Sequence, residues 1–134
     1  MRAVIKDYHS PDVDLCDFGP DYPEDFGFLL QMFVGPSEDS GEEAFDVLVC
    51  TPKWASRRVR ETGPLVGRGV LLVENHSWYE IRGFLEKYVN ALEAPTWDRL
   101  AEKIGRLGNW EFEGDPGQRS VACSADLQNM RKST

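Results

Sequence analysis

The first half of the chain alternates apolar runs with acidic connections that contain proline or glycine. Strand-like patterns cover residues 2–8, 26–34 and 44–51. The short acidic connection SEDSGEE joins the second run to the third, so we expect a hairpin in which 44–51 pairs antiparallel with 26–34. Residues 11–25 are rich in proline and aspartate and predict a long surface loop.

The third apolar run, FDVLVCTPKW, places a cysteine and a tryptophan close together. In a strand, Phe45, Val47 and Val49 share one face, and Cys50 lies on the other. Pro52 has no N–H to donate to a sheet and is expected to end the strand. The position of Cys50 within this strand predicts a buried thiol with a raised pKa.

Two helices are predicted in the second half of the chain. Ser77 and Glu80 form a capping box, whose hydroxyl and carboxylate satisfy free amides at a helix start, and they predict a helix over residues 78–93. Pro95 breaks this helix, and Thr96 caps a second one. The apolar stripes of the two helices are Ile81, Phe84, Leu85, Tyr88 and Leu92 in the first, and Trp97, Leu100, Ile104 and Leu107 in the second.

Extended segments flank these helices. Residues 69–75, GVLLVEN, predict another buried strand, and residues 109–114, NWEFEG, alternate Trp110 and Phe112 with acidic neighbours and predict a final short extended segment. Residues 55–68 contain arginines and a turn, but no pattern that predicts an element. We therefore expect an α+β fold with a mainly antiparallel sheet of about four strands and two C-terminal helices packed on it.

The length and composition allow one globular domain. A chain of 134 residues with 41% hydrophobic residues can build a single core. We expect one α+β domain over residues 1–114. Residues 115–134 contain too few large aliphatic side chains to offset the entropy of ordering, so we expect a polar, mobile C-terminal tail.

Negative charge is concentrated in the first fifty residues. They hold twelve acidic and two basic side chains, a net charge of -10, whereas the remaining 84 residues have a net charge of +2. An acidic surface repels phosphate backbones and anionic lipid, which disfavours nucleic-acid and membrane partners and favours a basic protein partner. Acidic loops that serve only solubility give the same pattern, and charge alone does not separate these two readings.

The cysteines give no sign of a disulfide framework or a metal site. Cys16, Cys50 and Cys123 are odd in number and widely spaced, and the sequence has no C-x-x-C pair. With only two histidines, His9 and His76, we expect no metal and no cofactor. The longest apolar runs are shorter than the ~20 residues that cross a bilayer, and the first residues do not form a signal peptide, so we expect a soluble, cytoplasmic protein.

Two arrangements of reactive side chains leave an enzymatic function open. Cys50 and His76 both lie at or near strand ends and suggest a nucleophilic dyad, although no third group to orient the histidine is identifiable. Glu111 and Glu113 share a face of an extended segment at a spacing of about 6.6 Å, within the range of an inverting carboxylate pair.

The order of the motifs resembles that of one known family. IKDYHSPD, FGFLLQMFVGP, GEEAFDVLVCTPKW, HSWYEIRGFLEKYVN and TWDRLAEKIGRLGNWEFEG follow one another along the chain. Over residues 1 to about 114 the sequence resembles the immunity protein 8 family of bacterial polymorphic-toxin systems. The resemblance implies a non-enzymatic antitoxin, without catalytic residues, that binds a cognate toxin in the cytoplasm. It does not extend to residues 115–134.

Together, the resemblance and the charge predict that acidic loops at 12–25 and 38–43 bind a basic toxin domain, with Trp54 as an exposed aromatic contact. The predicted contact residues are Asp12, Asp14, Asp17, Glu24, Asp25, Glu38, Asp39, Glu42, Glu43 and Trp54. Two other functions stay open at this point. One is a small cytoplasmic enzyme that uses Cys50 or the Glu111 and Glu113 pair, and the other is a module that binds a non-toxin protein.

Overall fold

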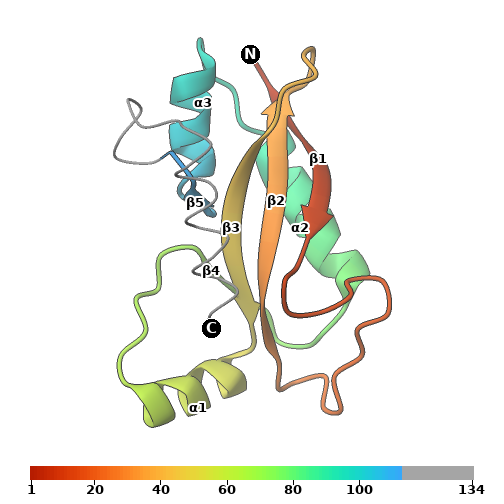
Figure 1. Cartoon of the computed structure of the whole chain (residues 1–134), viewed down its shortest axis with the longest axis vertical. Helices are drawn as coiled ribbons and strands as arrows, with labels where there is room; N and C mark the ends of the chain where they lie inside the picture. The colour runs from red at the N-terminus through yellow and green to blue at the C-terminus, as the bar shows by residue number, and fades with distance from the viewer. Residues whose placement is uncertain (113–134) are drawn as a thin grey trace.

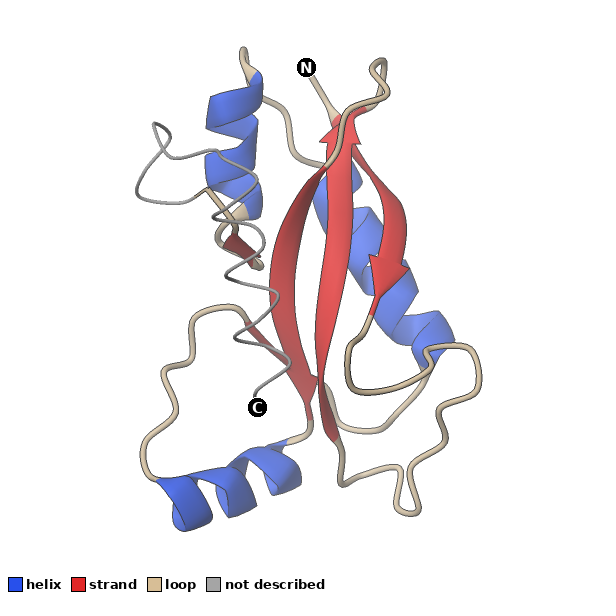
Figure 2. Ribbon diagram, in the orientation of Figure 1, coloured by secondary structure: helices blue, strands red, loops and turns tan. Residues whose placement is uncertain are grey.

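The computed structural model describes residues 1–112 and has an α+β fold (Figure 1). A mixed five-stranded sheet and three helices make up the described part of the chain (Figure 2). The predicted fold class is confirmed, but one of the three helices was not predicted. The tail at 115–134 and Glu113 lie outside the described residues.

The sheet is built around one long antiparallel hairpin. β2 (Gly27–Pro36) pairs with β3 (Glu43–Cys50) along the whole of β3, as the short acidic connection between them predicts. β1 (Ala3–His9) pairs antiparallel with the other side of β2, and its register shifts at a bulge between Ile5 and Asp7. β1 therefore forms one edge of the sheet.

Two short strands share the other side of β3. β4 (Val70–Leu72) runs parallel to the C-terminal part of β3, and β5 (Asn109–Trp110) runs antiparallel to its N-terminal part. The parallel direction of β4 follows from the crossover at residues 51–69, which contains a helix. The prediction of a strand within residues 69–75 is confirmed, but the prediction that this strand is buried was wrong. β4 is half-buried, and Leu72 is 56% exposed.

Two helices complete the core on one face of the sheet. α2 (Trp78–Asn90) and α3 (Trp97–Ile104) begin at the predicted caps, where the hydroxyls of Ser77 and Thr96 each accept a backbone N–H. The core joins the two helices to alternate residues of the central strands: Phe28, Leu30, Met32, Val34, Phe45, Val47, Val49, Ile81, Leu85, Val89, Leu100 and Ile104.

The stripe predicted for α2 is corrected at one position. Ile81, Leu85 and Val89 are buried, whereas Phe84 is 50% exposed. Phe84 precedes Leu85 by one residue and so points about 100° away from it around the helix.

The unpredicted helix is α1 (Pro52–Thr62), which follows β3 directly. The Thr51 hydroxyl accepts the backbone N–H of Trp54 at 3.3 Å, Pro52 occupies the first turn, and Gly63 ends the helix with a φ of 92°. No residue of α1 is buried, so the apolar periodicity that identified the other helices is missing. The available signal is local, a threonine cap followed by proline, and the same two residues also fit the end of a strand.

Candidate functional site at the hairpin end of the sheet

The two predicted acidic loops lie at opposite ends of the sheet (Figure 1). The loop at 12–25 joins β1 to the first residue of β2, and the connection at 37–42 joins the last residue of β2 to β3. The ten residues of β2 separate these ends by about 33 Å. A standard interface covers about 800 Å² of each partner, a patch roughly 30 Å across. One contact of that size, centred on one end, therefore does not cover the whole of the other.

Several carboxylates of the 12–25 loop are engaged in holding the loop in place. Asp12 accepts the backbone N–H of Leu29 at 2.8 Å, and Asp14 accepts the backbone N–H two residues further on at 3.1 Å. Asp25 forms an ion pair with Arg57 of α1. Each of these three carboxylates therefore uses one oxygen in a contact that holds the loop in place.

The 12–25 loop also adjoins the most basic element of the fold. Four basic side chains lie on α1: Lys53, Arg57, Arg58 and Arg60. Arg57 is paired with Asp25, and the other three offset the exposed carboxylates of Asp17 and Glu24 at this end of the molecule. Trp54, the predicted aromatic contact, is half-buried, and a Cβ built on Gly27 would overlap its indole ring. Trp54 thus packs over the start of β2.

At the other end, the hairpin carries two carboxylates engaged within the fold and two that face solvent. Asp39 accepts the backbone N–H of the next residue at 2.6 Å, and Glu43 accepts the indole N–H of Trp110 at 2.6 Å. Glu38 and Glu42 are exposed, and within residues 1–112 no hydrogen bond engages their carboxylates. Glu38 and Glu42 are therefore the hairpin charges available to a partner.

Contacts with β1 and β2 hold the hairpin in place. The Lys6 ammonium donates to the carbonyl oxygen of Asp39 and, at 2.9 Å, to that of Gly41. The hairpin backbone lies so close to β2 that a Cβ built on Gly35 would overlap the Gly41 carbonyl oxygen. Because this arrangement exists before any partner arrives, binding would have to order little of the hairpin.

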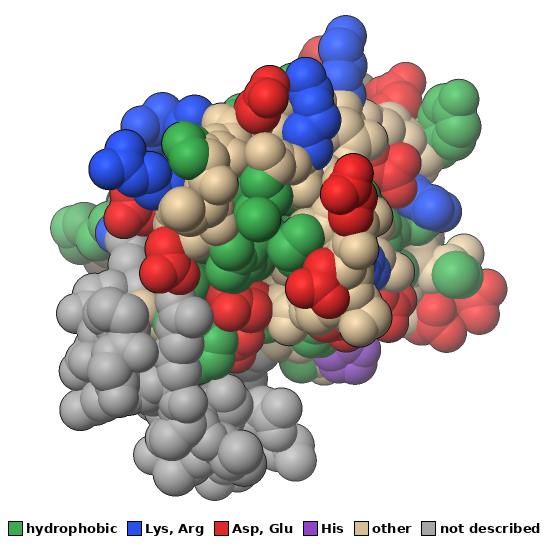
Figure 3. All heavy atoms as spheres, turned by 90° about the horizontal axis from the view of Figure 1, so that it is seen from above, with side chains coloured by type: hydrophobic (Ala, Val, Ile, Leu, Met, Phe, Trp, Pro, Cys, Tyr) green, Lys and Arg blue, Asp and Glu red, His purple; other side chains and the backbone are tan. Residues whose placement is uncertain are grey.

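Two shallow hollows border the hairpin and contain apolar side chains. One, of about 350 Å³, is lined by Met1, Pro36 and Trp97 together with hairpin residues, and a second, of about 470 Å³, adjoins it at Met1 and Pro36. Figure 3 looks down on this end of the molecule and shows an apolar patch with acidic side chains around it. We call Met1, Pro36, Glu38, Glu42 and Trp97 the hairpin-end surface.

Sequence reasoning found only part of the hairpin-end surface. Charge predicts the two glutamates as contacts, and the helical stripe predicts Trp97 as a core residue. No sequence signal identifies Met1 and Pro36. Trp97 is in fact half-buried and lies at the first position of α3. These side chains come from the chain start, the hairpin and α3, and only the three-dimensional structure brings such distant segments together.

The proposed cysteine nucleophile has the surroundings of a core residue. Cys50 is buried, and desolvation raises the pKa of its thiol, as predicted. The ring of His76 meets those of Phe18 and Phe26 edge to face at 4.9 and 5.1 Å, and burial lowers the pKa of this histidine. Within residues 1–112 no hydrogen bond joins Cys50 to His76.

We expect alkylation to separate the two thiols of the described domain. Cys16 is exposed and Cys50 is buried, so iodoacetamide should modify Cys16 at least about 100-fold faster in the folded protein. Timed labelling followed by peptide mass spectrometry measures both rates, and labelling in denaturant provides the control in which they converge. Equal rates in the folded protein would restore Cys50 as a candidate nucleophile.

The predicted carboxylate pair and a metal site are the remaining candidates for chemistry. Glu111 accepts the backbone N–H of Ala44 at 2.9 Å and thus closes the edge of β3, while its predicted partner Glu113 lies outside the described residues. The described part of the chain contains no group of three or more His, Cys, Asp or Glu side chains placed to hold a metal ion. None of its helices is long and apolar enough to span a bilayer.

Comparison with known proteins connects this domain to one family. Neither the curated proteins nor the solved structures contain a match to the chain. A family model described as Immunity protein 8 matches residues 3–114. The matched range includes all the strands and helices described above, and with them most of the hairpin-end surface. The resemblance predicted from the motifs is confirmed, and the chain belongs to the immunity protein 8 family.

Proposed function

We propose that this protein neutralises a cognate toxin by one-to-one binding in the cytoplasm, with the hairpin-end surface placed against a basic region of the toxin. Membership of the family supports the immunity role and implies a toxin as the partner. The observation that carries the finer proposal is the arrangement at the hairpin end. There, an exposed Met1 and the half-buried Pro36 and Trp97 adjoin two available carboxylates on a hairpin that is already fixed in place.

The parts of this surface suit different steps of binding. An apolar centre with a polar rim is the usual anatomy of a protein interface, and buried aromatic side chains contribute most of its affinity. Met1, which is 49% exposed, and Trp97 supply such a centre. Glu38 and Glu42 supply the rim, where carboxylates speed the approach of a basic partner more than they tighten the complex.

The carboxylates at the far end contribute little to this contact. Charges more than about 8 Å apart are largely screened at physiological ionic strength, and the 12–25 loop lies about 33 Å away along β2. Towards the hairpin-end surface, those carboxylates therefore act at low salt, through the long-range field, and not as direct contacts. This assignment limits the acidic residues of the hairpin-end contact to the hairpin itself.

A titration of toxin activity tests the proposed mode of neutralisation. The toxin domain encoded beside this chain is mixed with increasing amounts of the purified protein, and its residual activity is measured. One-to-one binding predicts a linear fall that reaches zero at equimolar protein. Loss that continues with time at substoichiometric amounts would instead indicate that the chain modifies the toxin catalytically.

A further inference from the structure

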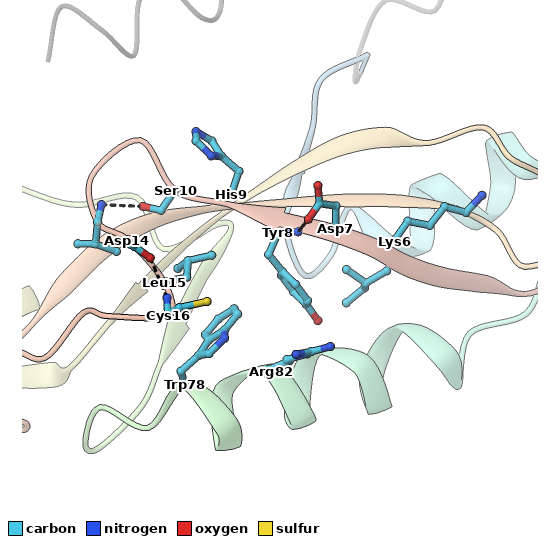
Figure 4. A pocket seen from close by; sticks show the side chains of 12 residues that line it. Lys6, Asp7, Tyr8, His9, Ser10, Asp14, Leu15, Cys16, Trp78 and Arg82 are labelled. Atoms are coloured by element: carbon cyan, nitrogen blue, oxygen red, sulfur yellow. Dashed lines mark hydrogen bonds between the residues drawn. The ribbon is translucent and has the colours of Figure 1, made fainter.

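The outer edge of β1 borders a groove that the proposed function does not use. Within residues 1–112, β1 pairs with β2 on one side only, and no other strand meets residues 5–9. A groove of about 530 Å³ follows this edge. On its other side it is bounded by the loop at 13–16 and by Trp78 and Arg82 of α2 (Figure 4). A row of consecutive strand residues thus lines an open channel.

The aromatic wall of the groove is rigid. Tyr8 meets Trp78 edge to face at 5.2 Å between ring centroids, and the Arg82 guanidinium lies 5.7 Å above the Tyr8 ring. Figure 4 shows Tyr8 directed towards α2 and Arg82. The Tyr8 hydroxyl and Arg82 both hydrogen-bond to Glu86, at 3.2 and 2.9 Å. These contacts fix the wall before a ligand enters.

The charged side chains that line the groove differ in how far contacts within the protein already engage them. Of its two cations, Arg82 is paired with Glu86, whereas Lys6 keeps its charge while its ammonium is bonded to the hairpin carbonyls. Lys6 and Arg82 thus stand against three carboxylates, those of Asp7, Asp14 and Glu86. The two that line the groove, Asp7 and Asp14, each use one oxygen to accept a neighbouring backbone N–H and are otherwise exposed. The groove therefore presents net negative charge to a ligand.

We propose that the β1 edge takes up an extended, Lys- or Arg-bearing segment of the toxin as an added strand. An exposed edge offers backbone groups to such a segment, and the channel beside it receives alternate side chains. At this edge the Tyr8 N–H is bonded to the Asp7 carboxylate, so the segment has to displace that one contact. The bulge at Lys6 and the charge of Asp7 are features that protect sheet edges from indiscriminate pairing. A cationic segment is the partner that the available carboxylates favour. This inference rests on the proposed function.

Blocking the groove at Cys16 tests the inference without changing the core. Cys16 lines the groove and is exposed, whereas Cys50 is buried. In a Cys123→Ser background, a bulky maleimide on Cys16 should weaken binding of the toxin domain about 10-fold, the effect of losing two or three strand hydrogen bonds. The matched control is the same adduct on Glu61→Cys in α1, with Cys16→Ser and Cys123→Ser, which should bind as the unmodified protein does.

Hydrogen exchange gives an independent result. Backbone amides of residues 5–9 should exchange more slowly in the complex than in the free protein. Unchanged exchange there, together with full affinity of the Cys16 adduct, would overturn the added strand while leaving one-to-one neutralisation intact. If the unmodified protein formed no complex with the toxin domain, the proposed function and this inference would fall together.

Discussion

Reversing both available hairpin charges, Glu38→Lys with Glu42→Lys, is expected to slow association with the toxin about 100-fold at low salt. Both side chains are exposed, and neither carboxylate is hydrogen-bonded within residues 1–112, so the fold should be unaffected. The effect should fall mainly on the association rate, because rim charges act while the partner approaches. Stopped-flow measurements over a range of salt concentrations give this rate.

The control pair is Glu61→Lys with Glu74→Lys. These residues are exposed, lie on α1 and after β4 at the opposite end of the sheet, and change the net charge by the same amount. At physiological salt their effect should stay below about 3-fold, since the distance exceeds the screening length several times. If both pairs slowed association equally under these conditions, total charge and not the hairpin would govern binding.

A single methyl group at Gly35 is expected to weaken toxin binding about 10-fold without changing any charge. The added Cβ of Gly35→Ala would overlap the Gly41 carbonyl oxygen, so the hairpin must move away from β2. Overpacking of this kind costs about 1–3 kcal/mol of stability, and a displaced hairpin must be ordered again during binding. Thermal unfolding and calorimetric titration measure the two effects.

Two further variants separate hairpin position from general instability. Lys6→Met removes both hydrogen bonds to the hairpin carbonyls and introduces no overlap, so it should weaken binding in the same direction. Gly83→Ala lies on an open part of α2, where the new Cβ meets nothing, and should raise stability by about 0.5–1 kcal/mol with unchanged affinity. Normal binding by both Gly35→Ala and Lys6→Met would show that hairpin placement is irrelevant.

The parts of the fold that sequence predicted are those with a local signal. Apolar runs indicated β2 and β3, and the short acidic connection between them predicted their antiparallel pairing. The hydroxyls of Ser77 and Thr96 marked the starts of α2 and α3. α1 was missed because none of its residues is fully buried and its few apolar residues form no long stripe. The parallel pairing of β4 depends on how the crossover turns back, which no short pattern encodes.

The candidate site was predictable in composition but not in geometry. Charge density identified both acidic loops, yet their separation follows from β2 running between them. Sequence cannot distinguish Asp12, which accepts a strand amide, from Glu42, which faces solvent. It also cannot show that Trp97 adjoins the hairpin, because more than fifty residues of chain separate them. Such distinctions depend on tertiary contacts.

Oxidative footprinting of the complex is the most direct test of the central claim, which is that the hairpin end binds the toxin. Each end has its own reporters: Met1, 49% exposed, and the half-buried Trp97 at the hairpin, and Tyr22, 66% exposed, in the 12–25 loop. Hydroxyl radicals followed by mass spectrometry compare their reactivity in the free and bound protein. The account predicts that Met1 and Trp97 lose reactivity in the complex while Tyr22 keeps it. Protection of Tyr22 with unchanged Met1 and Trp97 would contradict it.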